Sequence, residues 1–184
     1  MAALPFTGRV RDVLLGFKYR NRRQLATHLA ALLVRSLVGA GVRPGHDVDV
    51  VTWAPTSARR RRQRGFDQAE LVARQVARQL GVPCRRLLER EGPHVAQTGL
   101  DRAQRVHGPA FRARPDVPGR QVLLVDDVVT TGSTLRAAAD ALTRAGAERV
   151  VRCAVAATPA GRRQVATVIA GPWNATAAAR QRSA

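Results

Sequence analysis

Apolar residues recur at helical spacing in the first part of the chain. The pattern predicts a short helix from Thr7 to about Tyr19 and a second helix that starts near Arg22 and ends at Gly39. The second helix carries its apolar stripe on Leu25, Leu29, Leu32, Leu33 and Leu37. Together the two helices predict a helical N-terminal part over residues 7–40.

Further along the chain, predicted strands and helices alternate. Short aliphatic runs predict strands at residues 49–53, 82–88, 121–125 and 149–156. One helix is predicted to start at Asp67, with Glu70 three residues later as in a capping box, and another is predicted to start at Ser133. This order is typical of an α/β domain in which helices cover both faces of a mostly parallel sheet.

Polar segments separate these elements. Residues 54–65 contain proline, serine and five arginines, and this composition predicts an exposed loop. Residues 91–108 are polar and weakly patterned, as in a mobile loop with one short helical turn. Residues 159–184 are expected to form a basic, partly disordered tail, to which residues 165–169 could add one edge strand. Residues 1–158 are therefore expected to form one domain.

The overall composition agrees with one domain of ordinary size. The 184 residues are 45% hydrophobic, which is enough for a normal core. No window has the apolar length of a membrane span, and the first residues lack the apolar core of a signal peptide. We therefore expect no membrane insertion and a cytoplasmic location. The two cysteines, Cys84 and Cys153, do not form a C-x-x-C pair, which favours a reducing compartment.

The charge of the chain is strongly positive and is carried by arginine. The formal net charge is +18, and Lys18 is the only lysine. Guanidinium groups bind phosphate and carboxylate as a fork and stay protonated. We therefore expect polyanionic partners, but the charge alone does not distinguish DNA, RNA and phosphorylated small molecules.

The clearest chemical signal is the segment VLLVDDVVTTGSTL at residues 122–135. An apolar strand ends in Asp126 and Asp127, the chain turns, and a helix begins. Ligands of open α/β sheets bind at the carboxyl ends of strands, and the start of a helix offers backbone amides to a phosphate. The segment therefore predicts a phosphate site made by the backbone amides and hydroxyl groups of Thr130, Thr131, Gly132, Ser133 and Thr134.

The two acids would complement that phosphate site. Asp126 and Asp127 could accept hydrogen bonds from a ribose 2,3-diol or bind the water shell of Mg²⁺. A phosphate site beside a diol site predicts binding of a 5-phosphoribosyl group. The alternative is a solvated acidic pair followed by a threonine-rich helix cap. Three other classes are disfavoured because their motifs are absent from the sequence. P-loop NTPases would need G-x-x-x-x-G-K-[ST], dinucleotide enzymes a G-x-G-x-x-G that opens a helix, and nucleophilic hydrolases G-x-S-x-G.

Residues 122–134 resemble the signature of type I phosphoribosyltransferases, in which four apolar residues, two acids and two apolar residues precede T-T-G-x-T. Three more segments are similar to the ComF branch, the late-competence and DNA-utilisation relatives: GRVRDVLLGFKYRNRRQLATHLA, RRRRQRGFDQAELVARQVA and QTGLDRAQR. Asp67 stands where these relatives usually have Asn, and the zinc ribbon with which they usually begin has no counterpart in this sequence. The resemblance implies a type I phosphoribosyltransferase-like fold that binds phosphoribosyl diphosphate (PRPP) with Mg²⁺.

The resemblance also implies a pyrophosphate-binding loop after the strand at residues 49–53. This loop contains Arg59, Arg60, Arg61, Arg62 and Arg64. An arginine fork suits pyrophosphate well. A solvated basic loop and a nucleic-acid contact are the alternatives, and the sequence does not separate the three.

Two functions stay open at the level of sequence. In the first, the protein is a phosphoribosyltransferase: a nitrogen acceptor attacks C1 of PRPP, and pyrophosphate leaves. Asp126 and Asp127 would be the catalytic acids on the ribose or the Mg²⁺ side. In the second, the pocket binds PRPP or a nucleotide without turnover, and the basic surface serves single-stranded DNA uptake or processing beside DNA-uptake proteins. The acceptor is not visible in the sequence, and the oligomeric state stays open, a dimer being one option.

Overall fold

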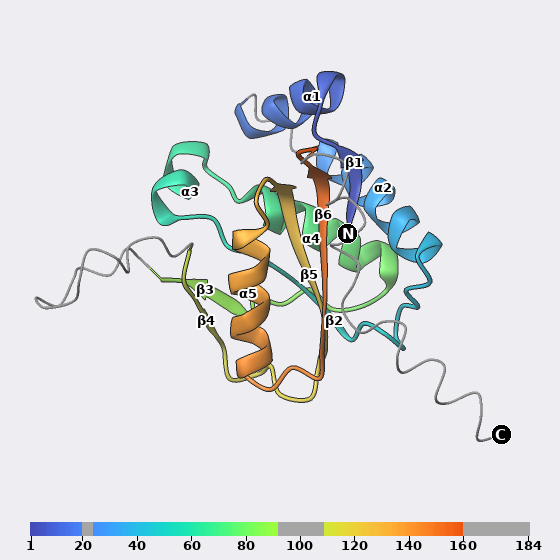
Figure 1. The fold of residues 1–184 in the computed structure, drawn as a ribbon, viewed down its shortest axis with the longest axis vertical. Helices are drawn as coiled ribbons and strands as arrows, with labels where there is room; N and C mark the ends of the chain where they lie inside the picture. The colour runs from blue at the N-terminus through green and yellow to red at the C-terminus, as the bar shows by residue number, and fades with distance from the viewer. Residues whose placement is uncertain (20–23, 92–108, 160–184) are drawn as a thin grey trace, which may run out of the picture.

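The computed structural model describes residues 1–19, 24–91 and 109–159 (Figure 1). At its centre is a parallel sheet of four strands in the order β1-β6-β5-β2. The strands are β1 (Ala2–Pro5), β2 (Val50–Trp53), β5 (Gln121–Val129) and β6 (Arg149–Ala157). Strand β5 lies between β2 and β6, and the side chains from Val122 to Val125 have no exposed surface. A continuous aliphatic run is what a strand buried on both faces requires.

Helices cover both faces of this sheet, as the sequence predicts. Helices α2 (Leu25–Gly39) and α4 (Gln68–Leu80) pack on one face, where Leu33, Leu37, Val72 and Val76 join one buried cluster. Helix α5 (Ser133–Arg144) packs on the other face through a second cluster (Figure 1). Helix α1 (Gly8–Tyr19) lies at the end of the sheet beside β1 and buries Leu14.

Strand β1 was not expected from the sequence. It pairs in parallel with β6 from Ala2↔Ala154 to Pro5↔Ala157, and the amino group of Met1 donates to the carbonyl of Arg152 at 2.9 Å. A run of four residues that ends in proline carries little strand signal, and proline is tolerated here because β1 is an edge strand. The pairing with β6 therefore decides its structure.

The predicted strand at residues 82–88 is wrong in its extent, and the regular strand of this region lies outside the four-stranded sheet. Cys84 forms only an isolated bridge to Val51, because Pro83 interrupts the run. The regular strand β3 (Leu88–Arg90) starts later and pairs antiparallel with β4 (Phe111–Ala113), forming a separate two-stranded ribbon on the α5 side.

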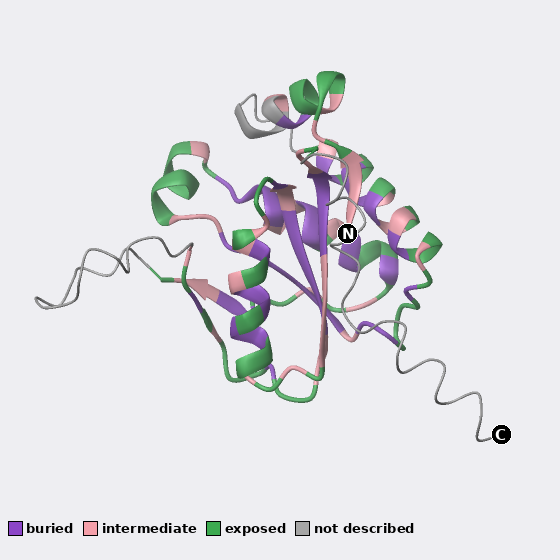
Figure 2. Ribbon diagram, in the orientation of Figure 1, coloured by how far each residue is buried: buried purple, intermediate pink, exposed green. Residues whose placement is uncertain are grey.

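The predicted loop at residues 54–65 is also corrected, because it contains the short helix α3 (Ala58–Arg64). The side chain of Ser57 accepts a hydrogen bond from the amide of Arg60 at 3.3 Å, which caps the helix start. Gly65 ends the helix with a φ of 73°, a left-handed conformation that favours glycine. Most of α3 is exposed, as Figure 2 shows, so the expected exposure holds for the helix. It is wrong for the start of the segment, because Ala54 and Pro55 are buried and Ala54 joins the core cluster on the α5 side.

Some predictions fall on residues that the structure does not describe. The loop predicted at 91–108 lies outside the described residues except for its first residue, and so do the edge strand predicted at 165–169 and nearly all of the predicted tail. Within the described ranges, no helix combines the length and the apolar character that a bilayer crossing needs.

A buried carboxylate joins α4 to the segment that follows β2. The Asp67 side chain caps α4 by accepting from the amides of Ala69 and Glu70 at 3.1 and 3.5 Å, as predicted. It also accepts from the amide of Thr56 at 2.8 Å. Glu70 accepts from Arg74 at 2.8 Å rather than completing the predicted capping box. Asp67 therefore fixes two backbone segments to one another.

Replacing this carboxylate should destabilise the fold. We expect Asp67→Ala to lower the free energy of unfolding by about 1–2 kcal/mol, the usual cost of losing an N-cap, because three amides lose their acceptor. Urea unfolding measures this quantity. The control is Asp140→Ala on the exposed face of α5, for which we expect a change within about 0.5 kcal/mol. Equal effects of the two substitutions would contradict a role for the Asp67 bonds in stability.

Candidate functional site

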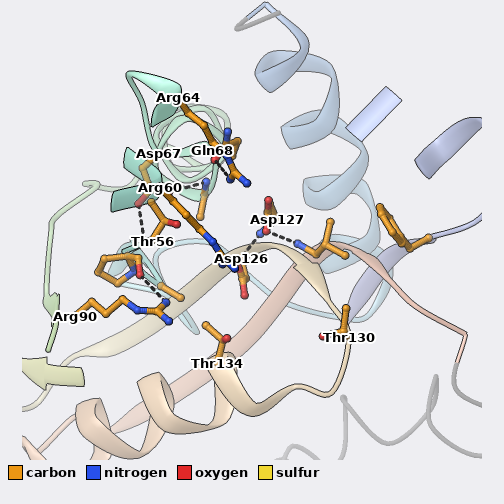
Figure 3. Close-up of a pocket in the computed structure, with 15 residues that line it drawn as sticks. Thr56, Arg60, Arg64, Asp67, Gln68, Arg90, Asp126, Asp127, Thr130 and Thr134 are labelled. Carbon is orange, nitrogen blue, oxygen red and sulfur yellow. Dashed lines mark hydrogen bonds between the residues drawn. The ribbon is translucent and has the colours of Figure 1, made fainter. Parts of the chain in front are cut away.

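A pocket of about 370 Å³ opens at the carboxyl ends of β2 and β5 (Figure 3). Its wall is built by the segment after β2, by α3, by the first turn of α4, by the end of β3 and by the connection from β5 to α5. Parallel strands bring their carboxyl ends to one edge of the sheet, which is the usual ligand position in open α/β folds. The register supports this, because Trp53 lies opposite Val125 and the amide of Ala54 donates to the Val125 carbonyl at 3.0 Å.

Asp126 and Asp127 both line the pocket, but they lie inside β5 rather than after it. The predicted strand ended at Val125, whereas pairing with β6 continues to Val129↔Ala157. The Asp126 carboxylate accepts from the amide of Asp127 at 2.8 Å, and the Asp127 carboxylate accepts from the next amide at 2.7 Å. These bonds and the continued strand pairing fix the backbone that carries the two acids.

The predicted phosphate site is divided between the pocket and its surroundings. Thr130 and Thr134 line the pocket, whereas Thr131, Gly132 and Ser133 do not. The hydroxyl groups of Thr131 and Ser133 lie 3.0 Å apart in hydrogen-bonding contact. Gly132 has a φ of 75° and turns the chain into α5, so its left-handed conformation determines where that helix starts.

Helix α3 divides the five arginines into two groups. Arg60 and Arg64 line the pocket, and Arg59, Arg61 and Arg62 are exposed outside it. Residues four apart lie on the same face of a helix, which explains why these two arginines share the pocket side. Figure 3 shows Arg60 extending toward Asp126. A loop prediction could not make this division, because it requires the helical period.

Arg90 at the end of β3 is a pocket residue that the sequence did not indicate. Its guanidinium donates to the carbonyl of Pro55 at 3.4 Å and lies 5.6 Å from the centre of the Phe111 ring. Burial lowers the pKa of Arg90, and the nearby Arg60 cation lowers it further. A guanidinium whose pKa is lowered by burial and by a neighbouring cation is typical of an anion-binding wall. No local pattern could have identified Arg90, since its position depends on the β3–β4 ribbon.

Asp67 adds a third carboxylate to the pocket wall. Burial raises the pKa of this carboxyl, and the hydrogen bonds from Thr56 and Glu70 oppose the increase. The Asp127 carboxylate also raises the pKa of Asp67, as a nearby like charge does. Three acids and three arginines therefore line one pocket.

Two other kinds of site, a metal cage made only of protein side chains and a thiolate nucleophile, have little support among the described residues. No cluster of three or more His, Cys, Asp or Glu side chains is arranged to bind a metal in the part of the chain that the structure describes. Burial raises the pKa of Cys84 to about 11 and that of Cys153 to about 12, so both thiols are protonated at neutral pH. Neither cysteine offers a thiolate nucleophile.

Solved structures show which class of fold this is. The chain superposes on the structure titled glutamine phosphoribosylpyrophosphate (PRPP) amidotransferase from B. subtilis complexed with ADP and GMP, with a TM-score of 0.53 and 23% sequence identity. The match covers 77% of this chain and 30% of that chain. The predicted α/β fold of the type I phosphoribosyltransferase class is therefore confirmed.

Sequence comparison then gives the family. The phosphoribosyl transferase domain family matches residues 67–174, and the chain belongs to that family. It is 34% identical to the DNA utilization protein YhgH of Salmonella typhimurium over 72% of this chain and 60% of that protein. It is 32% identical to Competence protein F of Haemophilus influenzae over 73% of this chain and 62% of that protein. These relatives confirm the resemblance to the ComF branch, and the chain spans about 60% of their length.

The turn at Gly132 gives a prediction about stability. A Cβ atom there would lie 3.9 Å from Val129, an ordinary contact, so the strain of Gly132→Ala comes from the backbone alone. We expect this substitution to lower the free energy of unfolding by about 1–2 kcal/mol, measured by urea unfolding. The control is Gly39→Ala at the end of α2, which has open space and no positive φ and should be neutral or stabilising. Equal destabilisation at both glycines would contradict the left-handed turn.

Proposed function

We propose that this domain binds PRPP with Mg²⁺ in the described pocket and transfers the 5-phosphoribosyl group to a nitrogen acceptor. The observation that carries the proposal is the convergence of three kinds of group on one pocket: hydroxyl groups at a helix start, carboxylates of β5 and guanidinium groups. PRPP has a phosphate, a diol and a diphosphate that match these groups. The pocket volume of about 370 Å³ falls within the usual range of small-ligand sites, about 300–1,000 Å³.

The start of α5 is the proposed site of the 5-phosphate. Thr130 and Thr134 bring hydroxyl groups to the pocket next to the N-terminus of a twelve-residue helix. The helix dipole and the first backbone amides favour a phosphate at this end. Thr131, Gly132 and Ser133 would contribute through the backbone of the same turn.

The acids of β5 are the proposed site of the ribose diol and of Mg²⁺. Mg²⁺ is usually bound by one or two carboxylates together with waters and substrate phosphates, without a cage made only of protein ligands. Asp126 and Asp127 fit that description, since they bring two adjacent carboxylates to a pocket in which the described residues form no larger metal cluster. Mg²⁺ bound to PRPP would offset the negative charge that develops on the leaving diphosphate.

The arginines opposite these acids are the proposed site of the diphosphate. Arg60 and Arg64 come from α3, and Arg90 comes from β3. Burial first and the Arg60 cation second lower the pKa of Arg90, and a multiply charged anion would offset both effects. Of the five arginines that the sequence proposed for this role, only these two of α3 are therefore retained, and Arg90 is added.

The proposed reaction forms one bond and breaks one bond at C1 of the ribose. The acceptor nitrogen bonds to C1 while the bond from C1 to the diphosphate oxygen breaks, and the electron pair leaves with diphosphate. The proton of the acceptor nitrogen passes to solvent. No protein nucleophile takes part, so the residues act by orienting PRPP and stabilising charge.

Binding of PRPP tests the site directly. With Mg²⁺ and PRPP at about 100 times the Kd, we expect the melting temperature to rise by about 5–10 °C, because a ligand of the folded state stabilises it by mass action. The paired substitution Asp126→Asn and Asp127→Asn should abolish the shift, since the diol and Mg²⁺ lose their anionic ligands. Asp140→Asn on the exposed side of α5 is the matched control and should retain it. A wild type that shows no shift at millimolar PRPP would refute the proposed site.

Turnover separates transfer from binding alone. Wild-type protein with PRPP, Mg²⁺ and a panel of nitrogen bases should release pyrophosphate with at least one acceptor. Binding without release for every acceptor would instead support a module that senses PRPP or a nucleotide.

The exposed side of α3 favours a second candidate function, that of a DNA-binding accessory protein. Arg59, Arg61 and Arg62 face solvent outside the pocket in a chain whose formal net charge is +18. The name of one relative, DNA utilization protein, suggests DNA as the polyanion, and the ComF resemblance implies the single-stranded form. In this case the exposed arginines would contact phosphates whether or not the pocket turns over PRPP.

The two groups of arginines provide matched variants. Neutralising Arg59, Arg61 and Arg62 to Gln should weaken single-stranded DNA binding and make its salt dependence shallower by about one unit of slope per lost phosphate contact. Neutralising Arg60 and Arg64 to Gln should instead weaken PRPP binding. The measurement is a salt titration of DNA affinity beside PRPP affinity for both variants. DNA affinity that is the same in the wild type and the first variant would reject the DNA-binding role of α3.

A further inference from the structure

Gln68, the first residue of α4, has a buried amide group at the pocket wall. Its side chain lines the pocket although the residue is only 2% exposed. The Oε1 atom accepts a hydrogen bond from Nη1 of Arg64 at 3.1 Å (Figure 3). The Nε2 atom is fully buried and has no hydrogen-bond partner among the described residues. An unpaired buried donor is costly and uncommon, so this atom requires an explanation.

The contact with Arg64 fixes the orientation of this amide. If the carboxamide were turned over, its NH₂ group would face the Arg64 guanidinium, and two donors would oppose each other. The Nε2 atom is therefore the one left to donate. Beside a guanidinium, a donor of this kind matches an anionic oxygen better than a neutral one.

The neighbouring carboxylate of Asp67 does not supply that oxygen. Its two oxygens accept from the amides of Thr56, Ala69 and Glu70, and neither of them accepts from Nε2 of Gln68. The hydroxyl groups proposed for the 5-phosphate belong to a different wall, at the start of α5, whereas Gln68 lies beside the arginines of α3 (Figure 3). The wall formed by Gln68, Arg60 and Arg64 therefore suits the other anionic end of the ligand.

We propose that Gln68, oriented by Arg64, donates a hydrogen bond from Nε2 to an oxygen of the diphosphate group and thereby sets the preference of the pocket for PRPP over ribose 5-phosphate. This inference rests on the proposed function and names a further binding residue for it. A carboxamide suits the position because it adds a donor without adding a cation to a wall that already contains Arg60, Arg64 and Arg90. Because Nε2 has no accessible surface in the free protein, this bond requires the pocket wall at Gln68 to open slightly as the diphosphate binds, and the orphaned donor is then satisfied in the complex.

Two substitutions at Gln68 test the role. Gln68→Met retains the length of the side chain and removes the amide, and Gln68→Glu retains an acceptor for Arg64 while replacing the donor with an anionic oxygen. The ligands are PRPP with Mg²⁺, pyrophosphate with Mg²⁺ and ribose 5-phosphate, each titrated by calorimetry. We expect Gln68→Met to weaken PRPP and pyrophosphate binding by about 10- to 100-fold, as for a lost hydrogen bond to a charged group, and to leave ribose 5-phosphate binding unchanged. Gln68→Glu should weaken the same two ligands further.

The control is Gln75→Met on the same helix. Gln75 also has a buried amide atom without a partner among the described residues, its Oε1, but it does not line the pocket. This variant should bind all three ligands as the wild type does. Because Gln68→Met removes an unpaired donor, the free variant should also unfold at a urea concentration no lower than the wild type.

The possible outcomes separate this inference from the proposed function. A wild type that does not bind PRPP refutes both. The role of Gln68 alone is refuted if the wild type binds PRPP but Gln68→Met lowers the affinities for PRPP and ribose 5-phosphate equally, or lowers neither. A Gln68→Met variant that binds PRPP and ribose 5-phosphate as the wild type does, but no longer transfers the phosphoribosyl group, would show that Nε2 contacts the acceptor. That result would also overturn the inference.

Discussion

The position of β5, buried on both faces between β2 and β6, is the constraint on which the rest of the structure depends. Its aliphatic run has no exposed surface from Val122 to Val125, so the strand can occupy only the centre of the sheet. The parallel register between β2 and β5 then brings the carboxyl end of β2 beside the acids of β5. Two segments that are far apart in the sequence, one with arginines and one with carboxylates, meet at one edge because of this pairing.

A second, polar constraint keeps the pocket in shape. Asp67 accepts hydrogen bonds from the start of α4 and from Thr56, so the segment after β2 cannot move independently of that helix. Helix α3 lies between these two points and is held at both ends, by the cap at Ser57 and the left-handed turn at Gly65. The pocket arginines therefore extend from a short helix with fixed ends, which lowers the entropic cost of holding them toward a ligand.

The pocket combines acidic, basic and neutral polar side chains from several elements. Carboxylates come from β5 and from Asp67, guanidinium groups come from α3 and β3, and one neutral donor, Gln68, lies beside the cations. Family membership and fold do not define the reaction, and this chain spans only about 60% of the length of its curated relatives. The functional proposal accordingly rests on the site, where the hydroxyl groups at the start of α5 and the guanidinium groups of α3 and β3 come from different elements of the pocket wall.

The sequence by itself determined the features that depend on neighbouring residues: the β5–turn–α5 segment, the Asp67 cap of α4, the two-sided α/β fold and the candidate acids. It did not determine the features that depend on distant partners. Strand β1 forms because β6 is beside it, and Arg90 reaches the pocket because β3 pairs with β4. The division of the arginines depends on the helical period of α3, and the unpaired Nε2 donor of Gln68 is apparent only from the burial of that side chain. Local patterns reflect backbone preferences within a few residues, whereas pairing and burial arise from contacts between segments that only the folded chain brings together.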